Sequence, residues 1–429
     1  MYPSVYDKIQ LMGLAITTTP GDLRSIEEMS DDGRYFGLED TGADIKARLD
    51  LLRQVIEAAA IRQDQDEKTL KIFTVPEFYF RGNKGAYPGV PKDVMQTHFS
   101  QFAETFLAKD EFKGWLFVLG TLLTSEMKVD REMEPTKSLF SLGDNLLSVY
   151  NRLHPQMPEF MKTGGTEGRQ LKQPIRKLLK YLDEDSEPES AKENLCSSGF
   201  LTNGGDQAFV SVLAAALNYS DSKAGIIVDN RCLIIEGGKE KPRMIQVLKK
   251  YKSKEDFILN GIEENYIQSI TRYPEIAERS ERKEEDNDSY SIFEYCGIRF
   301  GIEICLDHSR GRLREHLTRH PEDYVDVQLV ISCGMDIRNP SVIARDGGFV
   351  FNCDGEYVLE GAAENGEHCH TMLKSVLSCA KGKEAAVLSD YVKLNKEDKI
   401  TYPCEGELYP CQSFQLHIYS PYSLKKDVI

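Results

Sequence analysis

The sequence of 429 residues lacks features that would assign it to several specialised classes of protein. It has 53 Lys and Arg residues against 69 Asp and Glu residues, and a net charge of −16 argues against nucleic acid or an anionic membrane as its main partner. The longest apolar run, residues 208–217, is too short to cross a bilayer. The N-terminus has no basic stretch followed by an apolar core, so we expect no signal peptide.

The ten cysteines lack the paired spacing of a disulfide framework or a zinc site. The run His368-Cys369-His370 is too isolated to predict a set of metal ligands. The sequence also shows no internal repeats. We therefore expect a cytoplasmic, reduced protein with no metal site.

Apolar patterns predict a mixture of strands and helices. Strands are expected over residues 8–17, 70–75, 115–121, 244–251, 295–305, 325–333 and 348–355. Two further strands, 224–229 and 231–236, are expected to form a hairpin through Asp229-Asn230. Amphipathic spacing predicts a helix over 43–62, and a second helix is expected over roughly 91–108. This mixture predicts an α/β (α+β) fold.

Residues 122–207 interrupt this rhythm with prolines, paired glycines, a short basic helix near 169–182 and an acidic tract. We interpret the segment as an insertion at the functional edge of a sheet. A solvated excursion with no role fits the composition equally well.

The strand that ends at Cys305 is the centre of the functional prediction. Apolar residues alternate along it up to Ile304, and turn-forming residues follow, with Ser309 expected to cap a helix that begins near Arg312. Backbone N–H groups at such a junction stabilise a thiolate and bind a developing oxyanion. A cysteine in this position is therefore placed for nucleophilic chemistry.

Two other polar groups also lie at or just past predicted strand ends. Glu77 follows Pro76, which ends the strand 70–75, and Lys249 and Lys250 lie at the end of the strand 244–251. Adjacent residues of a strand point to opposite faces, so only one of these two lysines can face a shared site. We favour Lys249.

The order and context of these three groups resemble the nitrilase superfamily of carbon–nitrogen hydrolases. The matching segments are Val75-Pro76-Glu77-Phe78-Tyr79-Phe80, Val247-Leu248-Lys249-Lys250-Tyr251 and Gly301-Ile302-Glu303-Ile304-Cys305-Leu306-Asp307. The resemblance covers about residues 8–121 and 218–355, and the chain is identified as a divergent member. It implies a single nitrilase-like domain over 1–429, with the 122–207 insertion within it and a C-terminal extension over 356–429. It also implies a four-layer α-β-β-α sandwich that pairs into a homodimer.

The resemblance assigns catalytic roles to Glu77 as general base, Lys249 beside the oxyanion and Cys305 as nucleophile. Supporting candidates are Lys250, Glu303, placed on the same strand face as the cysteine, and Asp256, where many members of the family carry a second glutamate. Candidates for substrate binding are Tyr79, Leu306 through its N–H, and His308. The implied substrate is a small amide or nitrile, and no cofactor is expected.

Three other readings of the sequence remain open. Nitrile hydrolysis or acyl transfer could use the same cysteine. A nitrilase-like binding or regulatory module could keep the scaffold without turnover. A thiol-based redox sensor would instead undergo reversible oxidation at Cys305.

Overall fold

The computed structural model describes residues 5–19, 36–83, 85–88, 94–128, 225–252, 256, 291–358, 368–402, 408 and 414–424. Within these ranges the protein has a mixed α+β fold with two open sheets and few helices. The helices are α1 (Thr41–Ile61), α10 (Leu306–Arg310) and α11 (Arg312–Arg319), with π-helical turns at Met95–Ser100 and Ala103–Leu107 and short 3₁₀ turns at Asp110–Phe112, Asn339–Ser341 and Lys396–Asp398. The expected helix 43–62 is thereby confirmed as α1.

The first sheet has the strand order β15-β16-β1-β2-β4-β5-β6. Parallel pairing joins β1 to β2 and β2 to β4, while the outer strands pair antiparallel. Two short strands add to it, β17 beside β1 and β3 beside β4. The bounds are β1 Lys8–Ala15, β2 Thr69–Thr74, β3 Tyr87–Pro88, β4 Trp115–Lys128, β5 Gly225–Glu236, β6 Met244–Leu248, β15 Lys399–Tyr402, β16 Phe414–Ile418 and β17 Tyr422–Ser423.

The second sheet has the strand order β14-β13-β10-β9-β8-β7, with the central strands β8, β9 and β10 parallel. Its bounds are β7 Ile292–Tyr295, β8 Ile298–Ile304, β9 Val325–Ser332, β10 Ala344–Asp354, β13 Met372–Ser378 and β14 Val387–Leu388. A separate two-stranded ribbon pairs β11 (Tyr357–Val358) with β12 (His368–Cys369).

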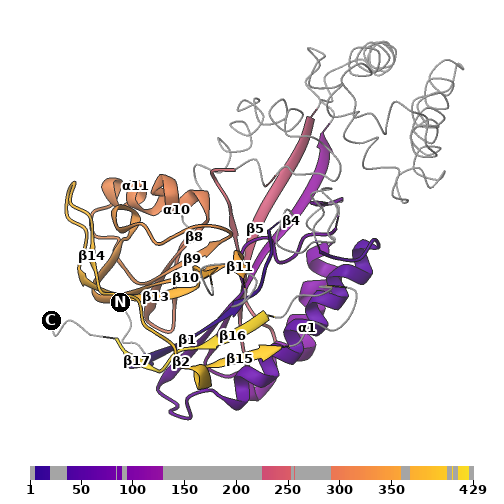
Figure 1. Ribbon diagram of the computed structural model, residues 1–429, viewed down its shortest axis with the longest axis horizontal. Helices are drawn as coiled ribbons and strands as arrows, with labels where there is room; N and C mark the ends of the chain where they lie inside the picture. Colours follow the sequence, from indigo (N-terminus) through magenta and orange to yellow (C-terminus); the bar gives the residue numbers. More distant parts are fainter. Residues whose placement is uncertain are drawn as a thin grey trace, which may run out of the picture.

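The two sheets pack face to face, and helices lie outside them (Figure 1). One buried apolar cluster joins Val118 of the first sheet to Ile302 of the second. A second cluster packs Leu52 of α1 on the other face of the first sheet, and a third packs Leu313 of α11 on the other face of the second. Burying four faces in this way removes most of the apolar surface of both sheets from water.

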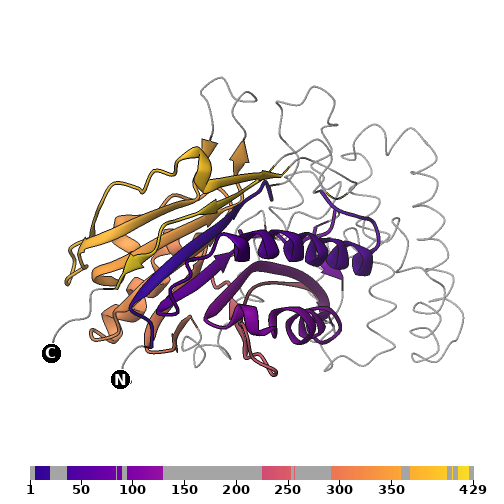
Figure 2. The same cartoon turned by 90° about the horizontal axis from the view of Figure 1, so that it is seen from below.

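Helix α1 forms where the sequence combines a cap with an apolar stripe. The side chain of Asp40 accepts a hydrogen bond from the N–H of Ala43 at 2.7 Å, which satisfies one of the open donors of the first turn. Ile45, Leu49 and Leu52 recur on the face that is buried against the sheet. Figure 2 shows the helix lying along the strands of the first sheet.

The prediction of a hairpin through Asp229-Asn230 is wrong. β5 runs unbroken from Gly225 to Glu236 and pairs antiparallel with β4 along most of its length. This long ladder outweighs the turn propensity of the Asp-Asn pair. Asn230 is therefore a strand residue with a buried side chain.

Two other expectations about element boundaries also change. Ser309 does not cap a helix, because it lies inside α10, and Gly311 with φ 70° precedes α11. β4 continues to Lys128, seven residues beyond the expected end at 121. The rest of the expected insertion, from residue 129 to 207, lies outside the described residues, as does the helix expected near 169–182.

The segment expected as a C-terminal extension contributes strands to both sheets. β13 pairs with β10 in the second sheet, and β16 pairs with β1 in the first. The yellow strands of this segment lie beside the indigo β1 in Figure 2. This segment therefore belongs to the packed body of the protein.

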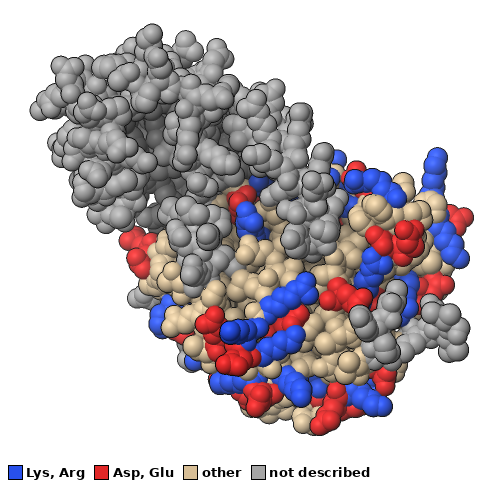
Figure 3. All heavy atoms as spheres, turned by 180° about the vertical axis from the view of Figure 1, so that it is seen from behind, with Lys and Arg blue, Asp and Glu red and all other residues tan. Residues whose placement is uncertain are grey.

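Positive and negative side chains are mixed on the described surface. On the face in Figure 3, the Lys and Arg side chains of the described residues are interspersed with Asp and Glu side chains. Within the described segments, none of the helices has the length and apolar character that crossing a membrane requires.

Candidate active site

Glu77 lies on a tight turn that follows β2, and a glycine in β4 makes room for it. A side chain at Gly120, whose φ is 71°, would place its Cβ 2.3 Å from the carbonyl oxygen of Pro76. Thr121 next to this glycine accepts the N–H of Phe78 at 2.8 Å through its hydroxyl. The N–H of Glu77 itself donates to the carbonyl of Ser332 in the other sheet at 3.2 Å. The turn is thus fixed from both sheets.

The Glu77 carboxylate binds Lys249 and Asn230. Its Oε1 accepts from Lys249 Nζ at 2.8 Å and from Asn230 Nδ2 at 2.9 Å. Oε2 is buried and accepts no well-formed hydrogen bond within the described part of the chain. The carboxylate therefore keeps one oxygen available for a proton.

Asp256 completes the same buried cluster. Its Oδ2 accepts from Lys249 Nζ at 2.7 Å, and its Oδ1 accepts from Asn230 Nδ2 at 2.7 Å. Asp256 and the side chains of Glu77 and Lys249 are fully buried. Lys249 and Asn230 therefore bridge two carboxylates that would otherwise repel each other.

Cys305 lies on a strained elbow between β8 and α10. Its φ of 45° and ψ of −103° are unusual for a residue with a side chain. Its N–H donates to the carbonyl of Ile331 at 2.9 Å, and its Sγ lies 3.9 Å from the carbonyl oxygen of Cys333. The side chain is 9% exposed, so it is almost but not completely enclosed.

The pKa of Glu77 is raised from 4.5 to about 7. Burial is the main cause, and the negative charge of Asp256 adds to it, while the Lys249 ammonium and a contact with the Cys305 thiol act in the opposite direction. A carboxyl with this pKa can both take up and release a proton near neutral pH.

The other two groups keep their protons in the resting site. Burial disfavours the Lys249 ammonium, but the charges of Asp256 and Glu77 outweigh it and hold the pKa of this lysine well above its usual range. Burial, followed by the charge of Glu77, raises the pKa of the Cys305 thiol. The arrangement is therefore a thiol beside a carboxyl group and a permanent ammonium.

Asp307 fastens the elbow to the segment that carries Lys249. Its carboxylate accepts the N–H of Lys250 at 3.0 Å and of Tyr251 at 2.7 Å, and Arg312 Nη1 at 3.1 Å. Burial raises the pKa of Asp307, and Arg312 opposes this shift. No role was expected for Asp307 from the sequence, although it lies two residues after the cysteine.

The structure separates the two adjacent lysines. Lys249 points into the cluster, whereas Lys250 Nζ lies 3.9 Å from Glu315 Oε2 and 5.4 Å from the ring of Tyr251. Lys250 is therefore not part of the cluster. Both lysines lie just after β6, which ends at Leu248, and not within the strand as expected.

Glu303 and His308 form a different buried group under α11. Glu303 binds the N–H of Leu313 at 2.8 Å, Gln328 Nε2 at 2.9 Å and His308 Nδ1 at 2.6 Å. Because His308 Nε2 accepts the N–H of Arg338, its proton lies on Nδ1 and is donated to Glu303. The prediction that Glu303 and Cys305 lie on the same strand face is wrong. β8 ends at Ile304, and the backbone turns at Cys305.

Tyr79 and Leu306 have different positions relative to the site. Tyr79 is packed in the cluster under α1, and its hydroxyl donates to the carbonyl of Arg48 at 3.0 Å, so it does not line the site. Leu306 is the first residue of α10, so its N–H has no carbonyl of a preceding turn to bind. That N–H adjoins Cys305, where an oxyanion would form.

Asn230 and Phe78 belong to the site but were not expected there. Asn230 was assigned to a turn, and only its place opposite β4 brings it to Glu77. Phe78 has a φ of 60°, and its ring lies 5.4 Å from Lys249 Nζ. Its position directly after Glu77 was the only signal in the sequence.

Among the described residues, no group of three or more His, Cys, Asp and Glu side chains could hold a metal ion. No protein-family model matches the chain, and a search of curated proteins finds no match.

The raised pKa of Glu77 predicts a pH-dependent effect of the substitution Glu77→Gln on stability. Between pH 4.5 and 7 the unfolded chain loses the proton of Glu77 while the folded chain keeps it, so this group lowers stability as the pH rises. Glutamine does not titrate. We expect the free energy of unfolding of the variant, relative to the parent, to improve by about 2–3 kcal/mol between pH 5 and 8.

Urea denaturation followed by circular dichroism at several pH values measures this difference. A difference between variant and parent that stays constant from pH 5 to 8 contradicts a carboxyl group that holds its proton in the folded state.

Proposed function

We propose that the protein is a cysteine-dependent hydrolase of non-peptide carbon–nitrogen bonds, of amidase type, and a divergent member of the nitrilase superfamily. One observation carries this proposal: a thiol, a carboxyl group and an ammonium from three distant segments converge on one buried site. Its substrate is a small amide, and the chemistry of the chain's own residues requires no cofactor.

The arrangement of the elements supports the finer part of the proposal. Helix α1, the two sheets and α11 follow one another as layers, which agrees with a four-layer α-β-β-α sandwich of nitrilase type. In this proposal residues 1–429 form one domain with an insertion that follows β4, the chain pairs into a homodimer, and the protein is cytoplasmic.

The first half-reaction forms a thioester. Cys305 Sγ attacks the carbonyl carbon of the amide, and the thiol proton passes to Glu77 Oε2, the oxygen that has no well-formed hydrogen bond. The carbonyl oxygen becomes an oxyanion, which the Lys249 ammonium and the N–H of Leu306 stabilise. As the intermediate collapses, the C–N bond breaks, Glu77 gives its proton to the leaving nitrogen, and the amine departs.

The second half-reaction restores the enzyme. Glu77 takes a proton from water as the water oxygen attacks the thioester carbon, and the C–S bond of the resulting intermediate breaks. The carboxylic acid leaves, and the proton returns to Cys305. A pKa of about 7 suits Glu77 to both directions of this transfer.

The same thioester permits related reactions. An amine in place of water gives acyl transfer. Attack of Cys305 on a nitrile gives a thioimidate, which water converts into the thioester with release of ammonia. We take amide hydrolysis as the primary activity, because Glu77 is positioned to protonate a leaving amine.

The thioester predicts a covalent adduct on Cys305 and on none of the other cysteines. Incubation with a panel of small amides and nitriles, followed by intact mass spectrometry, should show an acyl adduct that hydroxylamine removes, since hydroxylamine cleaves thioesters. Cys305→Ala should abolish the adduct, whereas Cys353→Ala, at a buried cysteine in β10, should retain it. Uniform, slow modification of several cysteines would instead favour a scaffold without turnover.

The two adjacent lysines provide a matched pair of variants. Lys249→Met removes the cation beside the oxyanion and should lower kcat/KM by about 10²–10³-fold. Lys250→Met alters a side chain that points to Glu315 and should change kcat/KM less than about 3-fold. Circular dichroism verifies that both variants fold. Equal losses in the two variants would contradict the role given to Lys249.

A further inference from the structure

One buried amide contacts the lysine and both carboxylates of the candidate active site. Asn230 lies within β5, and its side chain is fully buried. Its backbone carbonyl accepts the N–H of Lys249 at 2.9 Å, while its Nδ2 donates to Glu77 Oε1 at 2.9 Å and to Asp256 Oδ1 at 2.7 Å. This residue therefore holds the lysine through its backbone and the two carboxylates through its side chain.

The hydrogen bonds determine which end of this amide faces the carboxylates. Its NH₂ group has two hydrogens and meets two acceptors, whereas an amide oxygen in the same place would face two carboxylate oxygens. The Oδ1 atom of Asn230 is buried and has no hydrogen-bond partner in the described part of the chain. Because a buried acceptor without a partner costs free energy, the orientation is set by the contacts of Nδ2.

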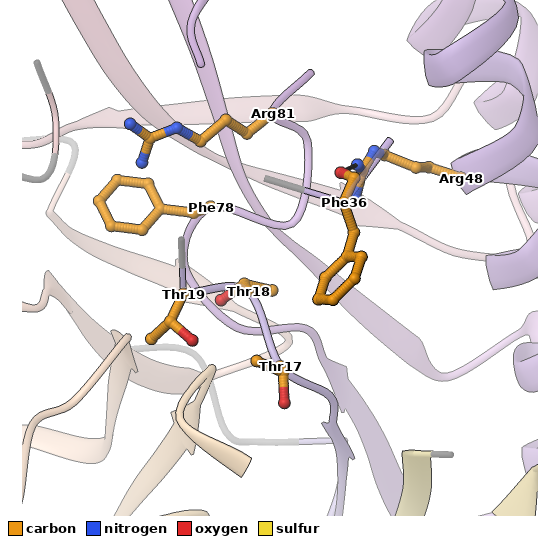
Figure 4. A pocket seen from close by; sticks show the side chains of 7 residues that line it. All are labelled: Thr17, Thr18, Thr19, Phe36, Arg48, Phe78 and Arg81. Atoms are coloured by element: carbon orange, nitrogen blue, oxygen red, sulfur yellow. Dashed lines mark hydrogen bonds between the residues drawn. The ribbon is translucent and has the colours of Figure 1, made fainter. Parts of the chain in front are cut away.

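The Lys249 ammonium binds a different oxygen of Asp256. Two of its three hydrogens are donated to Glu77 Oε1 at 2.8 Å and to Asp256 Oδ2 at 2.7 Å. Its Nζ also lies 5.4 Å from the centre of the Phe78 ring, within the range of a cation–π contact. Figure 4 shows the Phe78 side chain beside Arg81, whose guanidinium carbon lies 4.6 Å from the centre of the same ring. Asp256 Oδ1 is therefore left to the amide.

The two oxygens of Glu77 have different surroundings. Oε1 accepts hydrogen bonds from both Lys249 and Asn230, whereas Oε2 accepts no well-formed hydrogen bond among the described residues. The carboxyl group is also in contact with the Cys305 thiol. A proton is least stable on an oxygen that already accepts from two donors, so the proton of Glu77 belongs on Oε2.

One of the groups that face Glu77 competes for this proton. The titratable groups around it are Lys249 after β6, Cys305 at the elbow after β8, Cys333 after β9, and Asp256. Both thiols keep their protons, because burial raises the pKa of each. Asp256 is therefore the group in this set that carries the same charge as an ionised Glu77, and two neighbouring carboxylates favour a shared proton.

We infer that Asn230 is a positioning residue that directs the proton of Glu77 to Oε2, the oxygen that exchanges it with Cys305. The two amide hydrogens occupy Glu77 Oε1 and Asp256 Oδ1, so the carboxylates do not share a proton between these oxygens. The inference rests on the proposed function and identifies the residue that sets its proton transfer. Asn230 acts through Glu77 and not on the substrate.

The substitution Asn230→Leu removes both donors and keeps a similar side-chain volume. Loss of a hydrogen bond to a carboxylate favours its protonated form, and so does a proton shared with Asp256. We expect the inflection in the rate at which chloroacetamide alkylates Cys305 to move upward by about one pH unit from its position near pH 7 in the parent. Peptide mass spectrometry over a series of pH values measures this rate. A loss of folded protein alone lowers the yield but does not move the inflection.

Two further variants attribute the shift to the cluster. Gln328→Met is the matched control, because Gln328 is also a buried amide whose Nε2 donates to a carboxylate, that of Glu303 at 2.9 Å, outside the cluster. Its inflection should stay at the pH of the parent. Asn230→Asp keeps the shape of the side chain and replaces two amide hydrogens by at most one, so it should also move the inflection upward. This variant tests the inference if Asn230→Leu fails to fold.

The outcomes separate the two proposals. An inflection near pH 7 that neither substitution of Asn230 moves overturns the role of this residue and leaves the hydrolase intact. An equal shift in Gln328→Met also overturns that role. An inflection that moves as expected, with no adduct on Cys305 from any amide or nitrile of the panel, supports the role of Asn230 and overturns the hydrolase. The absence of an inflection in the parent overturns both, because the thiol and Glu77 then do not exchange a proton.

Discussion

The buried interaction of Lys249 with Glu77 and Asp256 is the constraint on which the site depends. Removing two carboxylates and an ammonium from water is costly, and each charge is tolerable only because the others and Asn230 satisfy it. Burial raises the pKa of Glu77 to about 7, and the charge of Asp256 adds to this shift while the Lys249 ammonium opposes it. In the proposed mechanism, burial of the cluster therefore provides the proton carrier that a thiol nucleophile requires.

The fold holds this cluster together through contacts between elements rather than within them. Glu77 donates its N–H to Ser332 in the opposite sheet, Asp307 fastens the segment after β6 to the cysteine elbow, and Gly120 lets β4 approach the glutamate turn. Such contacts run between packed layers, so in the proposed mechanism the reacting groups are positioned before a substrate binds. The strain at Cys305 and Phe78 is sustained by this surrounding packing.

Much of the local structure could be predicted from sequence, because periodic apolar residues and strand breakers act over short distances. The strand and turn that carry Glu77 and the amphipathic α1 are examples. What could not be predicted depended on long-range pairing. Asparagine is typical of turns, yet Asn230 lies within β5, because the pairing of β5 with β4 continues on both sides of it. Strand alternation predicted that Glu303 and Cys305 share a face. Alternation does not reach Cys305, because β8 ends one residue earlier, at Ile304.

The central claim, that the thiol of Cys305 and the carboxyl of Glu77 act as one unit, is tested most directly by the pH dependence of alkylation. Chloroacetamide is a small neutral reagent whose rate of reaction at Cys305 can be followed by peptide mass spectrometry in the parent and in Glu77→Gln. Our account predicts a rate in the parent that rises with an inflection near pH 7, where Glu77 ionises, and the loss of this inflection in the variant. The same pH profile in both proteins would contradict it.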